Sequence, residues 1–350
     1  AGNQNGTFAD NYSQSNTFSI KTNRPLWEGA RLELNWDLRW SVNKNYQIST
    51  DANGLQTITS TAITGKLERS YMAFPDFFVF SLFNTNMDAV KERYDELLAE
   101  NPDGRTTELL AEAFEDGFEA FPWLSGILGN FFPRLNYGFR WDGLEKWSLL
   151  DGLADRISLE HRYQSSFSMA YRHSQDDGSR ITETQQVGSG FKPLIGVQLA
   201  FNQVWGGDLS VQTRWDKTGN FNLNTSASNI VEDNSDEFTM NLEFKKAGFE
   251  MPLFGLSLKN DIQFTLAFSL NKTSSRIYSV SDLGSGGQPR EGITRISIEP
   301  RVRYSISQRV QASLFYRYQR TRPDAEVGSR ITGTTSHEGG LEMRITIAGS

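Results

Sequence analysis

The sequence predicts an all-β transmembrane protein, an antiparallel outer-membrane β-barrel arc of roughly a dozen strands with an α-helical insert. Three observations lead to this prediction. Apolar and polar residues alternate along many stretches, and several stretches exceed the roughly 9–11 residues that cross a bilayer. The connections between them are alternately long and short, as in bacterial barrels.

Composition agrees with this fold class and excludes others. The 350 residues include no cysteine, which excludes disulfides and thiolate metal sites. A net charge of -7 argues against a general nucleic-acid binder. No run approaches the roughly 18 apolar residues of a membrane helix. Aromatic residues make up 12% of the chain, which girdles at two membrane interfaces would explain.

The strands are expected in two groups that flank the insert. Barrel strands are predicted over 1–70, a helical insert or cap over 71–133, and barrel strands over 134–350. Alternation predicts strands near 15–22 and over 31–42, 134–141, 156–172, 191–202, 208–225, 237–245, 256–270, 295–306, 309–319 and 339–347. The opening "AGNQNGTFAD" has no initiator Met and no signal peptide, so a processed protein or, preferably, a fragment is expected.

The two faces of the later strands differ in chemistry. The residues expected to face lipid are Leu258, Phe264, Leu266, Phe268, Leu314, Leu341, Met343 and Ile345. The residues expected to face a wet lumen are Arg295, Glu299, Arg301, Arg303, Arg309, Arg317, Glu342 and Arg344. The charges are interpreted as cross-strand ion pairs, and the alternative is an ion-selective or partner-binding patch.

The connections predict the orientation of the chain. Polar, loose connections are expected near 174–180, 226–237, 281–292 and 322–330, and tight ones near 202–208, 246–255 and 305–309. Because outer-membrane barrels have short periplasmic turns and longer outer loops, the last strand is expected to run inward and to end on the periplasmic side.

Between residues 85 and 130 the apolar residues recur with the spacing of an α-helix instead of a strand. Thr85 or Asn86 can cap a helix that carries Val90, Tyr94, Leu97 and Leu98, and after "NPDG" a second helix begins near Thr106 with Leu109, Leu110, Phe114 and Phe118. The two acidic helices are interpreted as a helical hairpin that is inserted in a surface loop and caps the outer mouth of the barrel. The alternative is a gate or plug inside the lumen. If the turn at 51–54 is periplasmic, the insert starts and ends outside. If that turn is external, the insert crosses the lumen or a strand is miscounted.

No catalytic or cofactor-binding pattern is found. His161 alternates with Leu159 and Tyr163 and is interpreted as an interfacial aromatic residue, whereas His173 and His337 are expected at loop edges. The segments "DDG" at 176–178 and "TDANG" at 50–54 do not complete a calcium loop, and "GSGGQP" lacks the Lys-Ser/Thr of a phosphate loop. The protein is therefore predicted not to be an enzyme and to need no cofactor or metal.

Five segments of the sequence, taken together and in this order, resemble a known protein family. They are "PLWEGARLELNWDLRW" at 25–40, "FPRLNYGFRWDGLEKW" at 132–147, "ISLEHRYQSSFSM" at 157–169, "FKPLIGVQLAF" at 191–201 and the ending "TSHEGGLEMRITI". Together they resemble the C-terminal region of the SprA/Sov family, the outer-membrane translocon of the type IX secretion system in Bacteroidota. The similarity extends over nearly the whole chain, although "AGS" follows Ile347 where many barrels end on an aromatic residue.

The resemblance implies a location, a function and partners. Family members are much longer and form one very large single-chain barrel in the bacterial outer membrane. The chain would be the C-terminal part of a channel that exports folded proteins carrying a sorting domain. Implied partners are the secreted cargo, a smaller barrel shuttle protein at a lateral opening, a periplasmic plug and outer-membrane lipid, with no nucleic acid. No nucleotide or metal is implied.

Two other classes of protein fit the same pattern. A self-contained porin or lipophile-transport barrel of about 12–14 strands requires the first strand to pair with the last. A non-membrane β-rich surface binding protein requires the apolar face to pack on a second sheet, with shorter strands and symmetrical loops.

Overall fold

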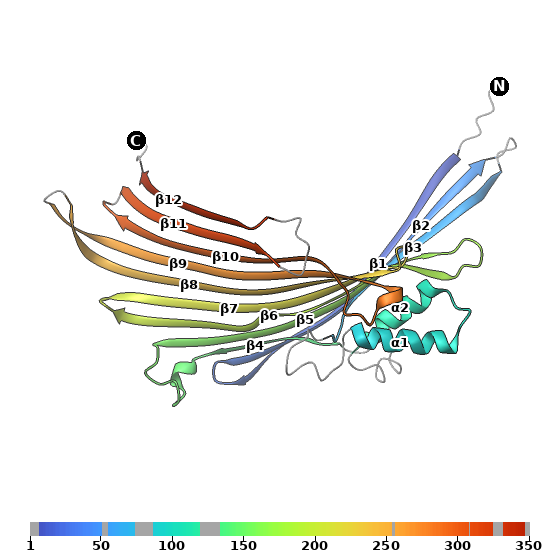
Figure 1. Cartoon of the computed structure of the whole chain (residues 1–350), viewed down its shortest axis with the longest axis horizontal. Coiled ribbons are helices and arrows are strands. Elements are labelled where there is room, and N and C mark those ends of the chain that lie inside the picture. The colour runs from blue at the N-terminus through green and yellow to red at the C-terminus, as the bar shows by residue number, and fades with distance from the viewer. Residues whose placement is uncertain are drawn as a thin grey trace, which may run out of the picture.

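The computed structural model describes residues 7–50, 55–73, 87–119, 134–253, 256–307, 309–324 and 332–346. In these residues a single 12-stranded antiparallel sheet has the order β1-β2-β3-β5-β6-β7-β8-β9-β10-β11-β12, and β4 pairs with β2 and β5 (Figure 1). Apart from β3 and β4, consecutive strands therefore lie side by side, which is the up-and-down arrangement expected from the alternation of the sequence.

The element bounds show how long the strands are. The strands are β1 (Thr7–Trp27), β2 (Ala30–Thr50), β3 (Gln56–Ser70), β4 (Asn136–Asp142), β5 (Arg156–His173), β6 (Arg180–Val204), β7 (Gly207–Asn224), β8 (Asn229–Leu253), β9 (Leu256–Ser279), β10 (Gln288–Ser305), β11 (Val310–Pro323) and β12 (Thr334–Ile345). The helices are α1 (Met87–Glu100), α2 (Thr106–Gly117) and the short 3-10 turns η3 (Leu144–Lys146) and η4 (Val280–Asp282). With 25 residues each, β6 and β8 far exceed the length of about 5–6 residues usual in soluble sheets.

Two turns on one side of the sheet are tight, and the first of them was predicted to be tight. Trp205 and Gly206 join β6 to β7 with positive φ values of 51° and 72°, as a two-residue type I′ hairpin requires. Gly29, between β1 and β2, has φ 78°, and an added Cβ would lie 1.8 Å from the carbonyl oxygen of Asp142. Only glycine fits there, because β4 ends against this turn.

One predicted connection is wrong. The loop predicted over 226–237 is short, because β8 begins at Asn229 and pairs with β7 from that residue onward. The connection predicted to be tight near 246–255 is tight, but it is shorter than these bounds, because β8 continues to Leu253 past a bulge between Lys246 and Phe249. From Glu232 to Glu237, β8 is polar on both faces, so this part lacks the alternation by which strands are recognised.

The strands β3 and β4 occupy successive parts of one strand position. Each pairs antiparallel with β2 on one side and with β5 on the other. On β5, Ser70 lies opposite Ser166 and Tyr137 lies opposite Tyr163. The chain therefore leaves the sheet after Ser70 and returns in the same direction. The insert interrupts a strand, so its predicted position within a loop is wrong, and β3 with β4 counts as one crossing.

The helices pack on each other and on one face of the sheet, at one end of the strands (Figure 1). The predicted stripes are confirmed, since Val90, Leu110 and Phe114 are fully buried, although Leu98 is exposed. Their core also contains the sheet residues Leu38, Leu67, Phe167, Met169, Val187, Leu223 and Ile230. The proposed caps Thr85 and Asn86 and the turn at 51–54 lie outside the described residues.

The sheet has two open edges. Among the described residues β1 pairs only with β2, and β12 pairs only with β11. The start of β1 and the end of β12 lie at opposite sides of the molecule in Figure 1. The expectation that the first and last strands do not pair with each other is confirmed.

Candidate functional site: the two faces of the sheet and the insert

The predicted lumen-facing charges lie on one face, which we call the polar face. Directly paired residues point to the same side of a sheet, and the pairs Arg303↔Ser313 and Ser313↔Glu342 connect this face from β10 to β12. It contains Arg295, Glu299, Arg301, Arg303, Arg317, Glu342 and Arg344. Arg309 is not in a strand, because β11 begins at Val310.

Most of these charges form a ladder across β10, β11 and β12. Glu299 accepts hydrogen bonds from Arg301 at 3.3 Å and from Arg317 at 2.8 Å. Arg301 also reaches Glu342 at 3.2 Å, and Arg317 reaches Glu338 at 3.1 Å. The interpretation as cross-strand ion pairs is supported for these residues. Arg295 and Arg344 form no ion pair with any described residue. With them and Arg303, the polar face of β10 to β12 carries more positive than negative charge between Arg295 and Arg344.

The predicted lipid-facing residues lie on the opposite face, which we call the apolar face. The pairs Phe264↔Val302, Val302↔Leu314 and Leu314↔Leu341 connect it from β9 to β12. Leu266, Phe268, Met343 and Ile345 share this face by alternation along β9 and β12. Leu314 and Leu341 are 59% and 69% exposed, so no described residue covers them. Leu258 lies in β9, but its side chain is outside the described part of the chain.

The apolar face ends at a defined row of residues. Trp215, Phe238 and Leu270 are paired across β7, β8 and β9. The next row on the same face consists of Lys217, Asp236 and Lys272. The indole Nε1 of Trp215 donates to Asp236 Oδ1 at 2.6 Å. A tryptophan that joins an apolar surface to a polar one is typical of a membrane–water interface.

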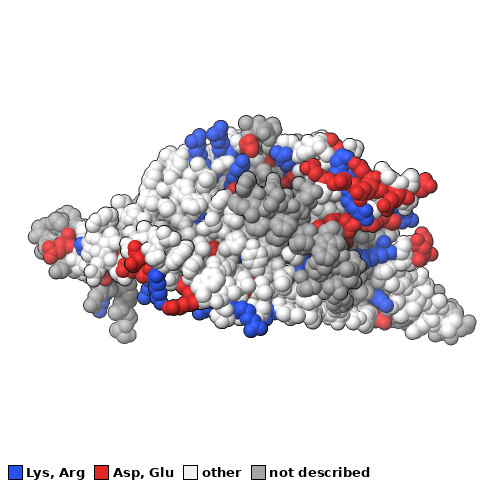
Figure 2. Space-filling view, turned by 90° about the horizontal axis from the view of Figure 1, so that it is seen from below, with Lys and Arg blue, Asp and Glu red and all other residues white. Residues whose placement is uncertain are grey.

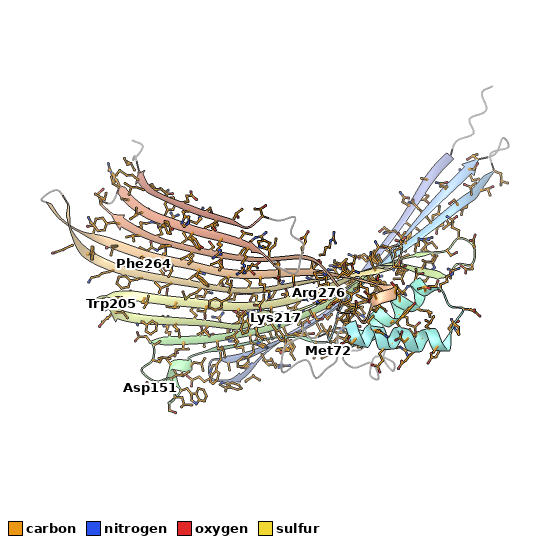
Figure 3. The ribbon with its side chains drawn as sticks, in the orientation of Figure 1. Met72, Asp151, Trp205, Lys217, Phe264 and Arg276 are labelled. Atoms are coloured by element: carbon orange, nitrogen blue, oxygen red, sulfur yellow. The ribbon has the colours of Figure 1, made fainter. Side chains whose placement is uncertain are left out.

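The insert packs on the apolar face, beyond this charged row. Ile230 and Phe238 are eight residues apart on β8 with no bulge between them, so their side chains point to the same side. Ile230 is buried in the core that contains the helices, together with Leu223 and Tyr278 on the neighbouring strands. In Figure 3, Lys217 and Arg276 lie near the helices and Phe264 lies toward the other end of the strands.

Two ion pairs, each with a buried arginine, fix the insert to the sheet. Arg69, at the end of β3, contacts Glu115 of α2 at 2.6 Å, and its side chain is only 3% exposed. Arg134, just before β4, contacts Glu119 at 2.7 Å, with side chains 2% and 4% exposed. The guanidinium of Arg69 also lies 4.9 Å from the ring centroid of Phe167.

Sequence reasoning did not predict these two ion pairs. One signal was present, because Arg69 occupies a position that the alternation with Leu67 assigns to the apolar face. A charge at such a position is costly unless it is paired. Arg69 and Arg134 also flank the predicted insert on its two sides.

Backbone groups next to the strand interruption are satisfied by side chains. The N–H of Asp37 donates to Ser70 Oγ at 2.9 Å, and the N–H of Ser165 donates to Asn136 Oδ1 at 2.8 Å. The hydroxyl of Tyr163 donates to the carbonyl oxygen of Ala73 at 2.7 Å. These bonds hold both ends of the insert in the sheet.

The histidines are held by structural hydrogen bonds. His161 is bonded through Nδ1 to the carbonyl oxygen of Leu194 at 2.6 Å and through Nε2 to the Tyr137 hydroxyl at 3.1 Å. His173 ends β5 as predicted, but His337 lies within β12 and not at a loop edge. Within the described ranges there is no group of three potential metal-ligating side chains. Neither described helix has the length and apolar character needed to cross a membrane.

Comparisons with known proteins give no family. No protein-family model matches the sequence, and no curated protein matches it. Among solved structures, the chain is compared with in-vitro folded OmpT, an outer membrane protein of Vibrio cholerae in its trimer form, at 8% identity and a TM-score of 0.19, covering 97% of this chain and 99% of that one. For the loop L8 deletion mutant of OmpT the identity is 7% and the TM-score 0.16, covering 96% and 99%. Similarities this low carry no argument about fold or function.

Proposed function

We propose that this sheet is part of the wall of an outer-membrane β-barrel, with the apolar face toward lipid and the polar face toward an aqueous lumen. The observation that carries the proposal is the separation of the two faces across β9 to β12. Large apolar residues such as Leu314 and Leu341 remain exposed on one side, while arginines and glutamates pair on the other. An apolar surface of this extent marks an interaction with lipid or protein.

The height of the apolar face supports a bilayer as that partner. From Ile262 to Leu270 the β9 residues on this face are apolar or aromatic. These eight steps cover about 27 Å along the strand at about 3.4 Å per residue. At a strand tilt of about 40°, this corresponds to about 21 Å along the barrel axis, close to the band of about 25 Å in outer-membrane barrels.

The function that we propose is that of the C-terminal part of a very large channel exporting folded proteins in type IX secretion. The phrases that resemble the SprA/Sov family support it, and so do the open edges of the sheet. Unpaired strand edges cannot persist in lipid, so a barrel containing this arc needs further strands. Cargo would pass along the polar face, and the shuttle barrel and periplasmic plug are the further partners implied.

The two alternative classes have less support. A self-contained porin requires β1 to pair with β12, and these two strands do not pair with each other in the described sheet. A surface binding protein requires a second layer over the apolar face, and only the two helices cover part of that face among the described residues. The surface binding protein also leaves the exposed apolar residues of β11 and β12 without a covering layer.

This orientation changes the role proposed for the insert. Because the helices share the face of Phe238 and Leu270, a lipid-facing apolar side puts them on the outer wall of the barrel, beyond the lipid band. A plug in the lumen would require them on the polar face. We therefore propose that the insert is a fixed support on the outside of the barrel wall, and not a cap over the pore mouth.

A photo-crosslinking experiment tests the proposed function. A photoreactive amino acid is placed at Gln263 on the polar face or at Leu266 on the apolar face, in cells that secrete a tagged cargo with a sorting domain. The expected result is cargo crosslinked at Gln263 and not at Leu266. Equal labelling at both positions, or cargo at Leu266 alone, would contradict the proposal.

A further inference from the structure

Three cationic side chains lie at one border of the apolar face, on β9 and β11. Arg320 lies in the same cross-strand row as Leu270, and one row farther from the lipid band Thr294 lies between Lys272 and Arg322. In the proposed orientation β12 runs inward, so this end of the strands is the outer end. We call Lys272, Arg320 and Arg322 the cationic border.

The cationic border is available to a ligand. Its three side chains are exposed, and none of them forms an ion pair or a hydrogen bond with any described residue. Asp236, opposite Lys272 on β8, accepts the indole N–H of Trp215 and does not pair with Lys272. Asp324 follows β11, beyond Arg322. Three cations outnumber these two carboxylates, so the border is positive.

The opposite end of the same face has a different chemistry. On β10 to β12 its border consists of Tyr304, Val310 and Ile345, which carry no charge. Cations are favoured where a membrane surface is anionic. In a bacterial outer membrane, phosphorylated glycolipid occupies the outer leaflet only. The difference between the two borders matches this asymmetry.

The helices leave the cationic border uncovered. Acidic side chains gather at the end of the molecule where the insert lies, as Figure 2 shows. Among the described residues, the core beneath the helices contains side chains of β2 to β9 and none of β10 to β12. An anionic lipid is therefore repelled by the insert but can approach β10 and β11 beside it.

The spacing of the cations suits a phosphate group. Lys272 and Arg322 are separated by one strand, so their Cα atoms are about 10 Å apart, and both long side chains can reach a group bound between them. Arg320 is two residues from Arg322, about 7 Å along the strand. Its aliphatic part can cover the last apolar row while its guanidinium extends to the headgroups. Arginine also binds phosphate through two parallel hydrogen bonds.

We infer that the cationic border binds the phosphates of lipid A, the anionic glycolipid of the outer leaflet, and that the acyl chains lie along the apolar face beside Phe268 and Leu270. The inference rests on the proposed function, because it requires this face to contact lipid and this end of the strands to be the outer one.

Native mass spectrometry of the delipidated full-length protein in detergent tests the site. The probes are diphosphoryl lipid A, lipid A without its phosphates, and inorganic phosphate. Diphosphoryl lipid A is expected to bind about tenfold more tightly than the dephosphorylated form, and inorganic phosphate should not compete with it. Arg322→Gln should weaken binding of diphosphoryl lipid A about fivefold. Lys272→Gln, on another strand, should have a similar effect, which separates loss of charge from local disturbance of β11.

The matched control is Arg295→Gln. Arg295 follows Thr294 on β10 and is also exposed and without an ion pair among the described residues, but it lies on the polar face. Its substitution should leave the affinity unchanged. Equal binding of the two lipid A forms, competition by inorganic phosphate, or equal effects of Arg322→Gln and Arg295→Gln would overturn the inference alone. Weaker binding in Arg295→Gln with no change in Arg322→Gln would place lipid on the polar face and overturn the proposed function as well.

Discussion

Arg134 and Glu119 are the most deeply buried ion pair among the described residues. Placing two charges in an apolar core is unfavourable unless each satisfies the other, so removal of one partner leaves an isolated buried charge. The pair joins the end of α2 to the residue that leads into β4. It therefore determines how firmly the insert is held against the sheet.

We predict that Arg134→Ala destabilises the docked insert by about 3–5 kcal/mol, because it leaves the Glu119 carboxylate buried without its partner. Hydrogen exchange of the α2 amides measures the effect. The control is Arg105→Ala, which removes an exposed pair with Glu108 at 3.2 Å and should change stability by less than about 0.5 kcal/mol. Similar exchange rates in the two variants would refute a role for the buried pair.

The turn after β5 contains a carboxyl group with a low pKa. The hydroxyl of Ser179 donates to Asp177 Oδ1 at 2.7 Å and its backbone N–H donates at 3.0 Å, and these bonds lower the pKa of Asp177 to about 2. Because the folded pKa is below the usual value, the stabilisation is present above about pH 4 and is lost as the pH falls through about 2.

Ser179→Ala removes the hydroxyl donor and should raise the pKa of Asp177 toward its ordinary value of 3.8. The midpoint is read from the carboxyl carbon shift of Asp177 in an NMR titration. Asp176 in the same turn provides an internal comparison. An unchanged Asp177 midpoint would show that the hydroxyl bond does not control this group.

At the scale of single strands, alternation assigns neighbouring residues of β9 to opposite environments. Leu266→Arg is expected to cost about 2–4 kcal/mol of barrel stability if this position lies at mid-membrane. Gln263→Arg, on the polar face, is expected to cost little. Urea or guanidinium unfolding in lipid vesicles measures both, and equal costs at the two positions would reject the barrel orientation.

The interrupted strand permits a deletion in register. Ser70 lies opposite Ser166 and Tyr137 opposite Tyr163, so two residues are needed between them. Leu135 and Asn136 supply these two if residues 71–134 are removed. The alternation is then preserved, with Leu135 on the apolar face next to Arg69 on its strand.

We predict that this deletion variant still assembles in the membrane, because the composite strand becomes continuous and keeps its partners on both sides. Heat-modifiable migration on gels and liposome flotation report assembly, and cargo release reports secretion. If the variant fails to assemble, the insert is needed for folding of the barrel wall and does not only support the wall from outside. A deletion of 71–133, shifted by one residue, is the control that should disrupt the register.

At the scale of the whole molecule, the unpaired edges of β1 and β12 distinguish an arc of a larger barrel from a closed barrel. The chain has no native cysteine, so introduced pairs report distances without background. Ser15→Cys with Ser41→Cys, opposite each other on β1 and β2, should form a crosslink. Ser15→Cys combined with Cys at Ser336, Glu338 or Gly340 of β12 should not. An efficient β1–β12 crosslink within one chain would support the self-contained porin.

The sequence by itself determined the chemistry of each strand. A side-chain period of two is a local property, so the assignment of Phe264 and Leu266 to one side and of Arg303 to the other needed no knowledge of neighbouring strands. The helical period likewise placed α1 and α2 within a few residues. Alternation failed where it was absent from the chain, over the polar residues 232–237 of β8.

Only the tertiary structure decided how these pieces combine. Whether β3 and β4 share one strand position depends on their register with β2 and β5, which are remote in sequence. The face on which the insert packs depends on the same register, because a shift of one residue would move every side chain to the opposite side. The buried pairs of Arg69 and Arg134 follow from that packing, since their partners on α2 and just after it become neighbours only when the insert is docked.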